Sequence, residues 1–352
     1  MRGAQMKTKI IILTLFFIWA AGTNNIQAQQ QDFAKNVSKR GSTAAGFLEI
    51  GVGARAIGMG GAYTAVGEDP SALFWNVGGI GKATRTGFFF NHTQWLADTR
   101  FDFLGIVVPI SGLGTIGVSL TALAMNDMDV TTVEYPEGSG QKFGAGDYAF
   151  GLAYAVNLTE RFSIGLHPKI IYQYIWDMTA VGFSVDLGVH YVTPFKGITI
   201  GFAMTNFGPK ISMSGENNRV LYDYDPNSTG NNDRVPALLE ADHWSLPLNF
   251  TIGMEYELIN TEMHHVIVAV DAQHPNNNYE SVNLGLEYVL AKNYALRVGY
   301  KSLFLSDSEE SLTLGGGIRY PIMGNILLYV DYAFADFGIL QNVHRFSLGI
   351  DL

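Results

Sequence analysis

From residue 87 to the last residue, the chain repeats a two-residue alternation between large apolar or aromatic side chains and small or polar ones. Tyr148, Phe150 and Leu152, for example, alternate with alanine and glycine. Successive side chains of a strand point to opposite faces, so the pattern predicts strands with one apolar and one small or polar face. A soluble sandwich would cover such apolar faces with a second sheet, whereas lipid covers them in a membrane barrel with a hydrated lumen. The alternation therefore predicts an all-β membrane protein.

Fourteen segments carry this alternation, and most of them have a length suited to a tilted strand across a membrane, about 9–11 residues. They lie near 87–97, 101–111, 114–124, 146–157, 161–174, 180–193, 197–207, 246–258, 264–274, 281–291, 293–302, 311–321, 324–335 and 343–352.

The connections between these segments support a barrel. The even-numbered joints are short, such as 112–113 and 158–160, and the odd-numbered ones include 125–145 and 208–245. Outer-membrane barrels have short periplasmic turns and longer outside loops. We therefore predict a 14-stranded antiparallel transmembrane β-barrel over 87–352, surrounded by outer-membrane lipid, with both chain ends on the periplasmic side.

The first 28 residues are typical of a secretory signal peptide. Arg2, Lys7 and Lys9 flank or precede an apolar run over 10–21, and cleavage is expected after Ala28. An apolar run of roughly 12 residues is too short to span a bilayer. We therefore expect export through a cleaved signal peptide to the outer membrane of a Gram-negative cell.

Composition and motifs exclude several classes of function. The chain has no Cys, which excludes a disulfide framework, a thiolate metal site and a Cys nucleophile. Its net charge of −10 and the lack of a basic stripe argue against a nucleic-acid partner. No serine-hydrolase elbow, zinc-protease helix or phosphate loop is present. We predict neither an enzyme nor a cofactor or metal site.

Residues 29–86, ahead of the barrel, have a different character. The stretch 51–76 is rich in glycine, which favours turns and close approach of backbones over regular elements. We predict that this segment fills the lumen as a plug, with a short helix over 71–75.

The glycine-rich segment resembles the N-terminal signature of the PorV/PorQ family, which is related to FadL-type transporters of hydrophobic compounds. The resemblance is carried by Ala45 to Leu48, Ile50 to Ala56, Gly58-Met59-Gly60-Gly61-Ala62-Tyr63, Asp69, Ser71-Ala72-Leu73 and Trp75-Asn76. The family usually has Asn-Pro-Ala-Gly where this chain has Asn76-Val77-Gly78-Gly79. The turn into the first strand is therefore expected to differ.

The resemblance implies a FadL-like barrel that serves as an outer-membrane component of the type IX secretion system. Such proteins bind the C-terminal signal domains of cargo and associate with the translocon or the attachment complex. The alternative is a FadL-like transporter of a hydrophobic small molecule. Because the predicted lumen face consists largely of small residues and charges, the sequence alone favours the secretion hypothesis.

Charges of both signs fall on the lumen face of consecutive strands. Mixed signs predict ion pairs with one another and with the plug rather than an ion-selectivity ring. The predicted contacts between plug and lumen wall involve Arg55, Gly58, Gly60, Gly61, Asp69, Asn76, Glu287, Arg297, Arg319, Asp331 and Arg345. His167 and His190 are expected on the same face as polar lining rather than as metal ligands.

The connection 208–245 carries apolar and aromatic side chains among Asn, Asp and Gly. Such residues on a polar loop predict either a docking surface for a protein partner or a lid over the barrel mouth. The residues concerned are Tyr222, Tyr224, Leu238, Leu239 and Trp244.

Overall fold

The computed structural model describes residues 39–195, 197–230, 232, 234–305, 308–322, 326–340 and 342–352. The predicted signal peptide lies outside these residues. No described helix is long and apolar enough to cross a membrane.

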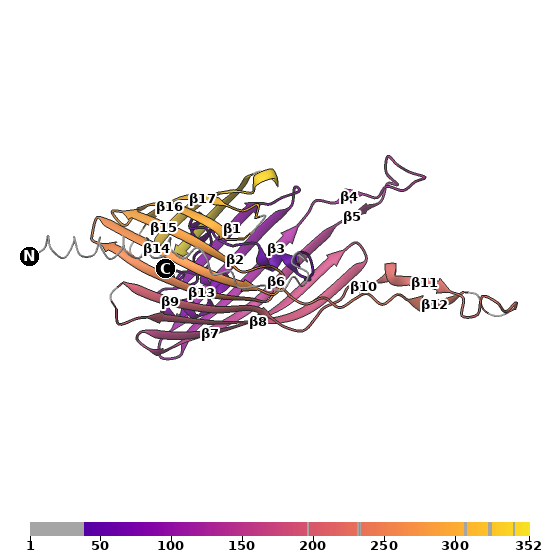
Figure 1. Ribbon diagram of the computed structural model, residues 1–352, viewed down its shortest axis with the longest axis horizontal. Coiled ribbons are helices and arrows are strands. Elements are labelled where there is room, and N and C mark those ends of the chain that lie inside the picture. The colour runs from indigo at the N-terminus through magenta and orange to yellow at the C-terminus, as the bar shows by residue number, and fades with distance from the viewer. Residues whose placement is uncertain are drawn as a thin grey trace, which may run out of the picture. The chain divides into compact units, whose positions relative to one another are not determined.

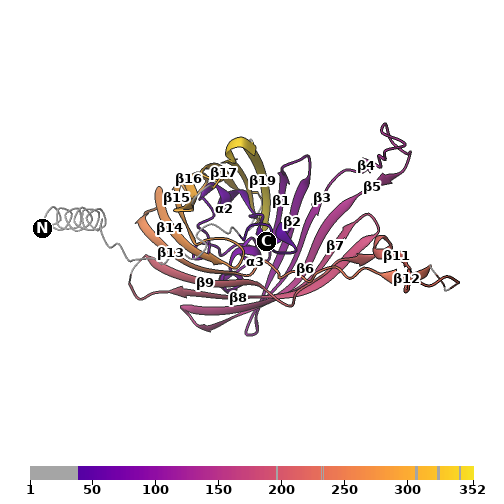
Figure 2. The ribbon, with the colours of Figure 1, turned by 45° about the vertical axis from the view of Figure 1, so that its right-hand side comes forward.

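Fourteen long antiparallel strands in the described chain close into a barrel (Figures 1 and 2). They are β1 (Gly87–Gln94), β2 (Arg100–Ile110), β3 (Gly114–Ala124), β6 (Ala145–Thr159), β7 (Phe162–Ile175), β8 (Met178–Val192), β9 (Ile198–Phe207), β13 (Asn249–Asn260), β14 (His264–Pro275), β15 (Ser281–Leu290), β16 (Tyr294–Leu303), β17 (Leu312–Pro321), β18 (Leu327–Asp336) and β19 (Asn342–Asp351). The barrel closes because β1 pairs with both β2 and β19. The predicted 14-stranded antiparallel barrel is therefore confirmed, with every boundary within three residues of its expected place.

The two faces of the barrel wall differ in chemistry as the alternation requires. On β7, Leu166 and Ile170 point outward and are 45% and 57% exposed, whereas His167, Lys169 and Ile171 point inward and are buried. The outer surface is thus apolar around the barrel, and lipid is the solvent that suits such a surface. The barrel is of the outer-membrane type.

The two ends of the barrel carry different connections. One end, called the inner end here, has short turns such as 160–161 and 291–293. The other, the outer end, carries two ribbons that extend beyond the barrel (Figure 1), β4 (Met128–Asp129) with β5 (Lys142–Phe143), and β11 (Arg219–Tyr222) with β12 (Val235–Leu238). A short strand, β10 (Ser214–Gly215), pairs with β8 and leads toward the second ribbon. One outer joint, 176–177, is as short as the inner ones.

The glycine-rich segment lies inside the barrel, where Figure 2 shows its helices within the ring of strands. It contains the 3-10 helix η1 (Gly46–Glu49), helices α2 (Ala54–Gly58) and α3 (Ala72–Trp75), and the 3-10 helix η2 (Val77–Lys82). Helix α2 contacts β17 and β18, whereas η2 contacts β6, β7 and β8. Helix α3 coincides with the short helix expected over 71–75.

The plug runs through the barrel from the outer end to the inner end. Thr43 bridges to Ser245 at the outer end, where Arg40 Nε also donates to Asn278 Oδ1 at 3.3 Å. At the inner end, Gly87 begins β1 opposite Asp351. The chain therefore ends on the inner side as expected, but the first described residues lie at the outer mouth. Strand alternation could not predict this position at the outer mouth, because the plug contains no strands and its sequence therefore shows no alternation.

Candidate functional site: a plugged lumen with a cavity on each side

The plug approaches the barrel wall so closely that side chains do not fit between them. A Cβ on Gly60 would lie 2.6 Å from the Leu284 carbonyl oxygen, and one on Gly299 would lie 2.0 Å from the Gly60 nitrogen. Gly60 also has a φ of +68°, which favours glycine. Gly58 meets Gly315 in the same way, with 3.0 Å between a Cβ on Gly58 and the Gly315 Cα. Glycines on both sides thus allow backbone to pack on backbone.

Side chains of the barrel wall satisfy backbone amides of the plug. Asp271 Oδ2 accepts from the amides of Tyr63 and Thr64, each at 3.0 Å. Two wall hydroxyls do the same at 2.8 and 3.0 Å, Ser347 for Ala54 and Thr313 for Gly60. Buried amides require such partners. The wall therefore replaces the hydrogen bonds that an irregular segment cannot make internally.

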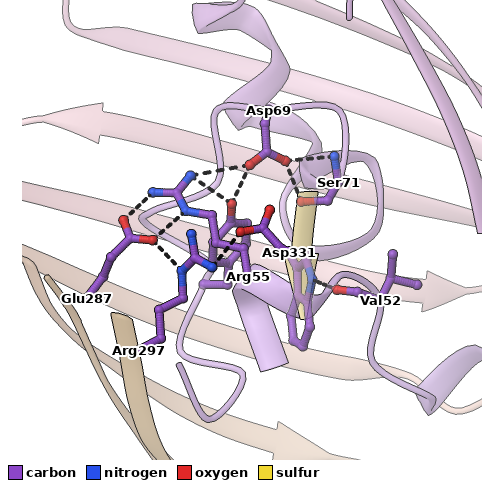
Figure 3. Close-up of polar contacts among 9 residues, drawn as sticks. Val52, Arg55, Asp69, Ser71, Glu287, Arg297 and Asp331 are labelled. Atoms are coloured by element: carbon purple, nitrogen blue, oxygen red, sulfur yellow. Dashed lines mark hydrogen bonds and ion pairs between the residues drawn. The ribbon is translucent and has the colours of Figure 1, made fainter. Parts of the chain in front are cut away.

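A chain of ion pairs ties helix α2 to the wall (Figure 3). The Arg55 guanidinium donates to both oxygens of Glu287, from Nε at 2.9 Å and from Nη2 at 2.7 Å. Arg297 donates from Nε to Glu287 and from Nη1 to Asp331, both at 2.6 Å. On the plug side, Arg55 Nη1 lies 3.3 Å from Asp69 Oδ2. We call these five residues the lumen ion network.

The wall side of the lumen ion network is buried, whereas Arg55 and Asp69 of the plug are partly exposed. Glu287 and Arg297 are 1% and 3% exposed. Tyr63 belongs to the same cluster, and its hydroxyl donates to Asp69. Charges buried in this way bind one another firmly, since water cannot replace a lost partner.

The remaining predicted plug and wall residues have other surroundings. Asn76 donates to the backbone oxygens of Thr64 at 2.7 Å and Val189 at 2.9 Å, and its Oδ1 accepts from the Gly78 amide at 3.0 Å. A Cβ on Gly61 would lie 3.3 Å from the Asn283 side chain and 3.4 Å from the Trp75 ring. Arg319 and Arg345 face inward but form no ion pair with any described residue. The Arg345 guanidinium instead lies 5.2 Å from the ring centre of Trp95 and 6.0 Å from that of Phe337.

A second buried polar cluster lies on β3, β7, β8 and β9, and sequence reasoning did not assemble it. Lys169 Nζ lies 2.8 Å from Asp186 Oδ2 and 2.6 Å from Asn206 Oδ1. His167 lies beside Ser119 and Asp186, at 2.9 and 3.4 Å. His190 instead bonds the Ala65 carbonyl at 3.0 Å. Alternation marked these side chains as lumen-facing, but only the register of the strands brings them together.

Cavities lie on both sides of the plug. The outer cavity, of about 560 Å³, is bounded by the plug residues Phe47 and Trp75 and by Trp95 near the outer end of the wall. The inner cavity, of about 250 Å³, is lined by Arg55, Asp69 and Asp331 of the lumen ion network and by charged residues of the inner rim. The lumen ion network therefore borders the inner cavity, whereas other plug residues border the outer one.

The predicted partner loop forms the β11–β12 ribbon and its surroundings. Its predicted residues are solvent-exposed and range from Trp244, at 49%, to Tyr224, at 84%. Tyr222 and Leu238 belong to the paired strands, with Leu239 directly after β12, and Trp244 bridges to Ile211 nearer the barrel. None of the five is buried against the barrel as the core of a closed lid would be.

Comparison with known proteins supports the architecture. No family model matches the chain, and no curated protein sequence matches it. Among solved structures, the Pseudomonas putida toluene transporter TodX is similar, with 12% identity, a TM-score of 0.53, and 86% of this chain and 97% of that chain covered. The CymD monoaromatic hydrocarbon channel (12% identity, TM-score 0.51) and the Ralstonia pickettii toluene transporter TbuX (13%, 0.50) give the same coverage. At this identity the likeness concerns the fold, and it confirms the expected FadL-like barrel.

Proposed function

We propose that the chain is an outer-membrane transporter of small apolar or amphipathic molecules, in which the plug separates a receiving cavity from an exit cavity. The observation that carries the proposal is the outer cavity, because it brings an aromatic plug surface to the mouth of the barrel. The sequence alone favoured secretion over transport. The cavity and the fold shared with toluene transporters reverse that preference.

The size and lining of the outer cavity suit a small ligand. Burying roughly 150 Å² of apolar ligand surface at about 25 cal/mol per Å² contributes about 4 kcal/mol. Passage onward requires the plug to shift, because plug residues border both cavities.

Uptake by intact Gram-negative cells tests the proposal, since their outer leaflet retards apolar molecules. Cells that express the chain should take up a radiolabelled aromatic compound faster than cells without it. Thr205→Trp, which places a large ring in the outer cavity, should reduce the gain. Phe207→Trp, on the lipid side of the same strand, should retain it. Equal uptake with and without the chain would refute transport.

A secretion role is the second candidate, supported by the PorV/PorQ-like motif and by the exposed apolar side chains of the two outer ribbons. In that case the partners would be the translocon or attachment complex and cargo C-terminal domains. Affinity purification of the tagged chain from its native membrane tests this role. Recovery of secretion proteins by the full chain, lost on deletion of 219–238, would favour it, whereas recovery with the ribbon deleted would exclude the ribbon as the docking site.

A further inference from the structure

The wall of the outer cavity carries a continuous row of amide and hydroxyl side chains. Thr205, Asn249, Gln273 and Ser281 line the cavity from the outer ends of β9, β13, β14 and β15. Asn249 stands directly opposite Thr205, and Gln273 directly opposite Ser281. Thr251, also in the cavity, stands opposite Gln273 and links the two pairs. Four successive strands thus present uncharged polar groups along one wall, which we call the amide row.

Most hydrogen-bonding capacity of the amide row is unused within the protein. Among the described residues, the side chains of Thr205, Gln273 and Ser281 have no hydrogen-bond partner, whereas Asn249 donates to Thr251 Oγ1 at 3.2 Å. The Oδ1 atom of Asn249 is buried and has no partner in the described chain. Buried polar groups in proteins are normally satisfied, by protein, water or ligand. The row therefore offers both donors and acceptors to a cavity occupant.

The charged side chains of the outer cavity are already engaged. Lys301 lies 2.5 Å from Glu310, and Lys169 is held by Asp186 and Asn206. Glu49 accepts from Asn277 Nδ2 at 3.1 Å. These are the only charged residues among the described cavity lining. Both cations of the lining are paired with carboxylates, so an organic acid would have to displace one of those carboxylates to enter the cavity.

The opposite side of the cavity is apolar. Phe47, Leu48, Phe74 and Trp75 of the plug border the same space. Aromatic surfaces bind flat apolar faces, and their energetic contribution grows with the area that they cover. A ligand that suits both sides has an apolar ring face and several hydroxyl groups at its edge.

Resting on the proposed transport function, we propose that the outer cavity selects uncharged ring compounds with several hydroxyl groups, the chemistry of a glycoside. The plug aromatics would cover the ring face, and the amide row would bind the hydroxyls, each of which both donates and accepts. A bare hydrocarbon would bury the amide row without satisfying it. An organic acid would bring a charge for which the cavity holds no spare cation.

Calorimetric titration of the purified barrel tests this selectivity. The protein is kept in an amine-oxide detergent, because a sugar-based detergent would compete for the site. Three probes share a phenyl ring, namely phenyl β-D-glucoside, toluene and phenylacetate. We expect the glucoside to bind at least tenfold more tightly than either of the others.

Matched variants locate the binding site. Gln273→Leu and Thr205→Val should each weaken glucoside binding about fivefold, the effect of losing one hydrogen bond worth roughly 1 kcal/mol. Toluene binding should not weaken. Gln94→Leu makes the same substitution on the exposed outer face of β1 and should change nothing. Retained heat-modifiable migration on gels shows that each variant is folded.

The outcomes separate this inference from the proposed function. Toluene binding as tightly as the glucoside, or a Gln273→Leu variant with unchanged glucoside affinity, would overturn the selectivity and leave transport standing. Phenylacetate binding most tightly would also overturn it. Binding of none of the probes, together with failed uptake of the aromatic compound by cells, would refute both proposals.

Discussion

Replacing Glu287 by Gln should loosen the plug without unfolding the barrel. The Glu287 carboxylate accepts three hydrogen bonds, two from Arg55 and one from Arg297. Removing one partner of a buried ion pair costs about 3–5 kcal/mol. Arg297 keeps Asp331 and Arg55 keeps Asp69, so we expect the lower value, about 3 kcal/mol. Each 1.36 kcal/mol is a factor of ten, so the population with a displaced plug should rise by roughly 150-fold.

Conductance of the purified protein in planar lipid bilayers measures this population as the fraction of time spent open. Glu257→Gln is the matched control, because Glu257 pairs with His265 at 3.0 Å on a partly exposed part of β13. An exposed pair contributes at most about 1 kcal/mol, so the control should change the open fraction less than about fivefold. Equal open fractions in the two variants would refute the role assigned to the lumen ion network.

A double variant tests whether the plug is held by the charge balance of the Arg55–Glu287 pair or by the geometry of the Arg55 side chain. Arg55→Met with Glu287→Gln removes one charge of each sign, and the remaining Arg297 still faces Asp331 at 2.6 Å. Replacing both members of a buried pair is often nearly neutral. The double variant should therefore open less often than Glu287→Gln alone. More frequent opening would show that the geometry of the Arg55 side chain, not its charge, holds the plug.

Three further predictions concern the plug and the wall. Gly60→Ala should lower the free energy of unfolding by about 2–4 kcal/mol in denaturant titration, whereas Gly112→Ala, with a similar positive φ and no neighbour within 4 Å, should cost only about 1 kcal/mol. Asp271→Ala leaves two buried plug amides without an acceptor and should cost about 2–4 kcal/mol in the same assay, and an unchanged midpoint would contradict this account. Ile170→Lys places a charge on the lipid face and should cost about 2–4 kcal/mol of folding into lipid vesicles, while Val133→Lys on the outer ribbon should fold normally.

The strands could be predicted from the sequence because the residues of each strand alternate between its lipid face and its lumen face. Alternation places Ile170 toward lipid and Lys169 toward the lumen without knowledge of any neighbour. The closed barrel then follows from strand number and joint lengths. The same local rule explains why boundaries agree within three residues.

The site was less predictable because alternation gives the face of a residue but not its height in the barrel. Glu287 and Arg345 were both expected in one band of charges, yet only Glu287 meets Arg55, while Arg345 lies beside Trp95. Strand tilt and register set that height, and they depend on the whole barrel. The amide row could not be predicted for the same reason. Thr205 and Ser281 lie on one wall of the cavity because the register of two intervening strands brings them to the same height.

The path of the plug has a consequence for biogenesis. The polypeptide passes from the mouth marked by Thr43 down to Gly87, where β1 pairs with β19 to complete the wall. If the barrel closed first, the plug segment would have to enter through one of its ends. A plug that had already folded would be too wide to enter in this way. We therefore expect β1 to pair with β19 late in assembly, after the plug has packed against the strands that enclose it.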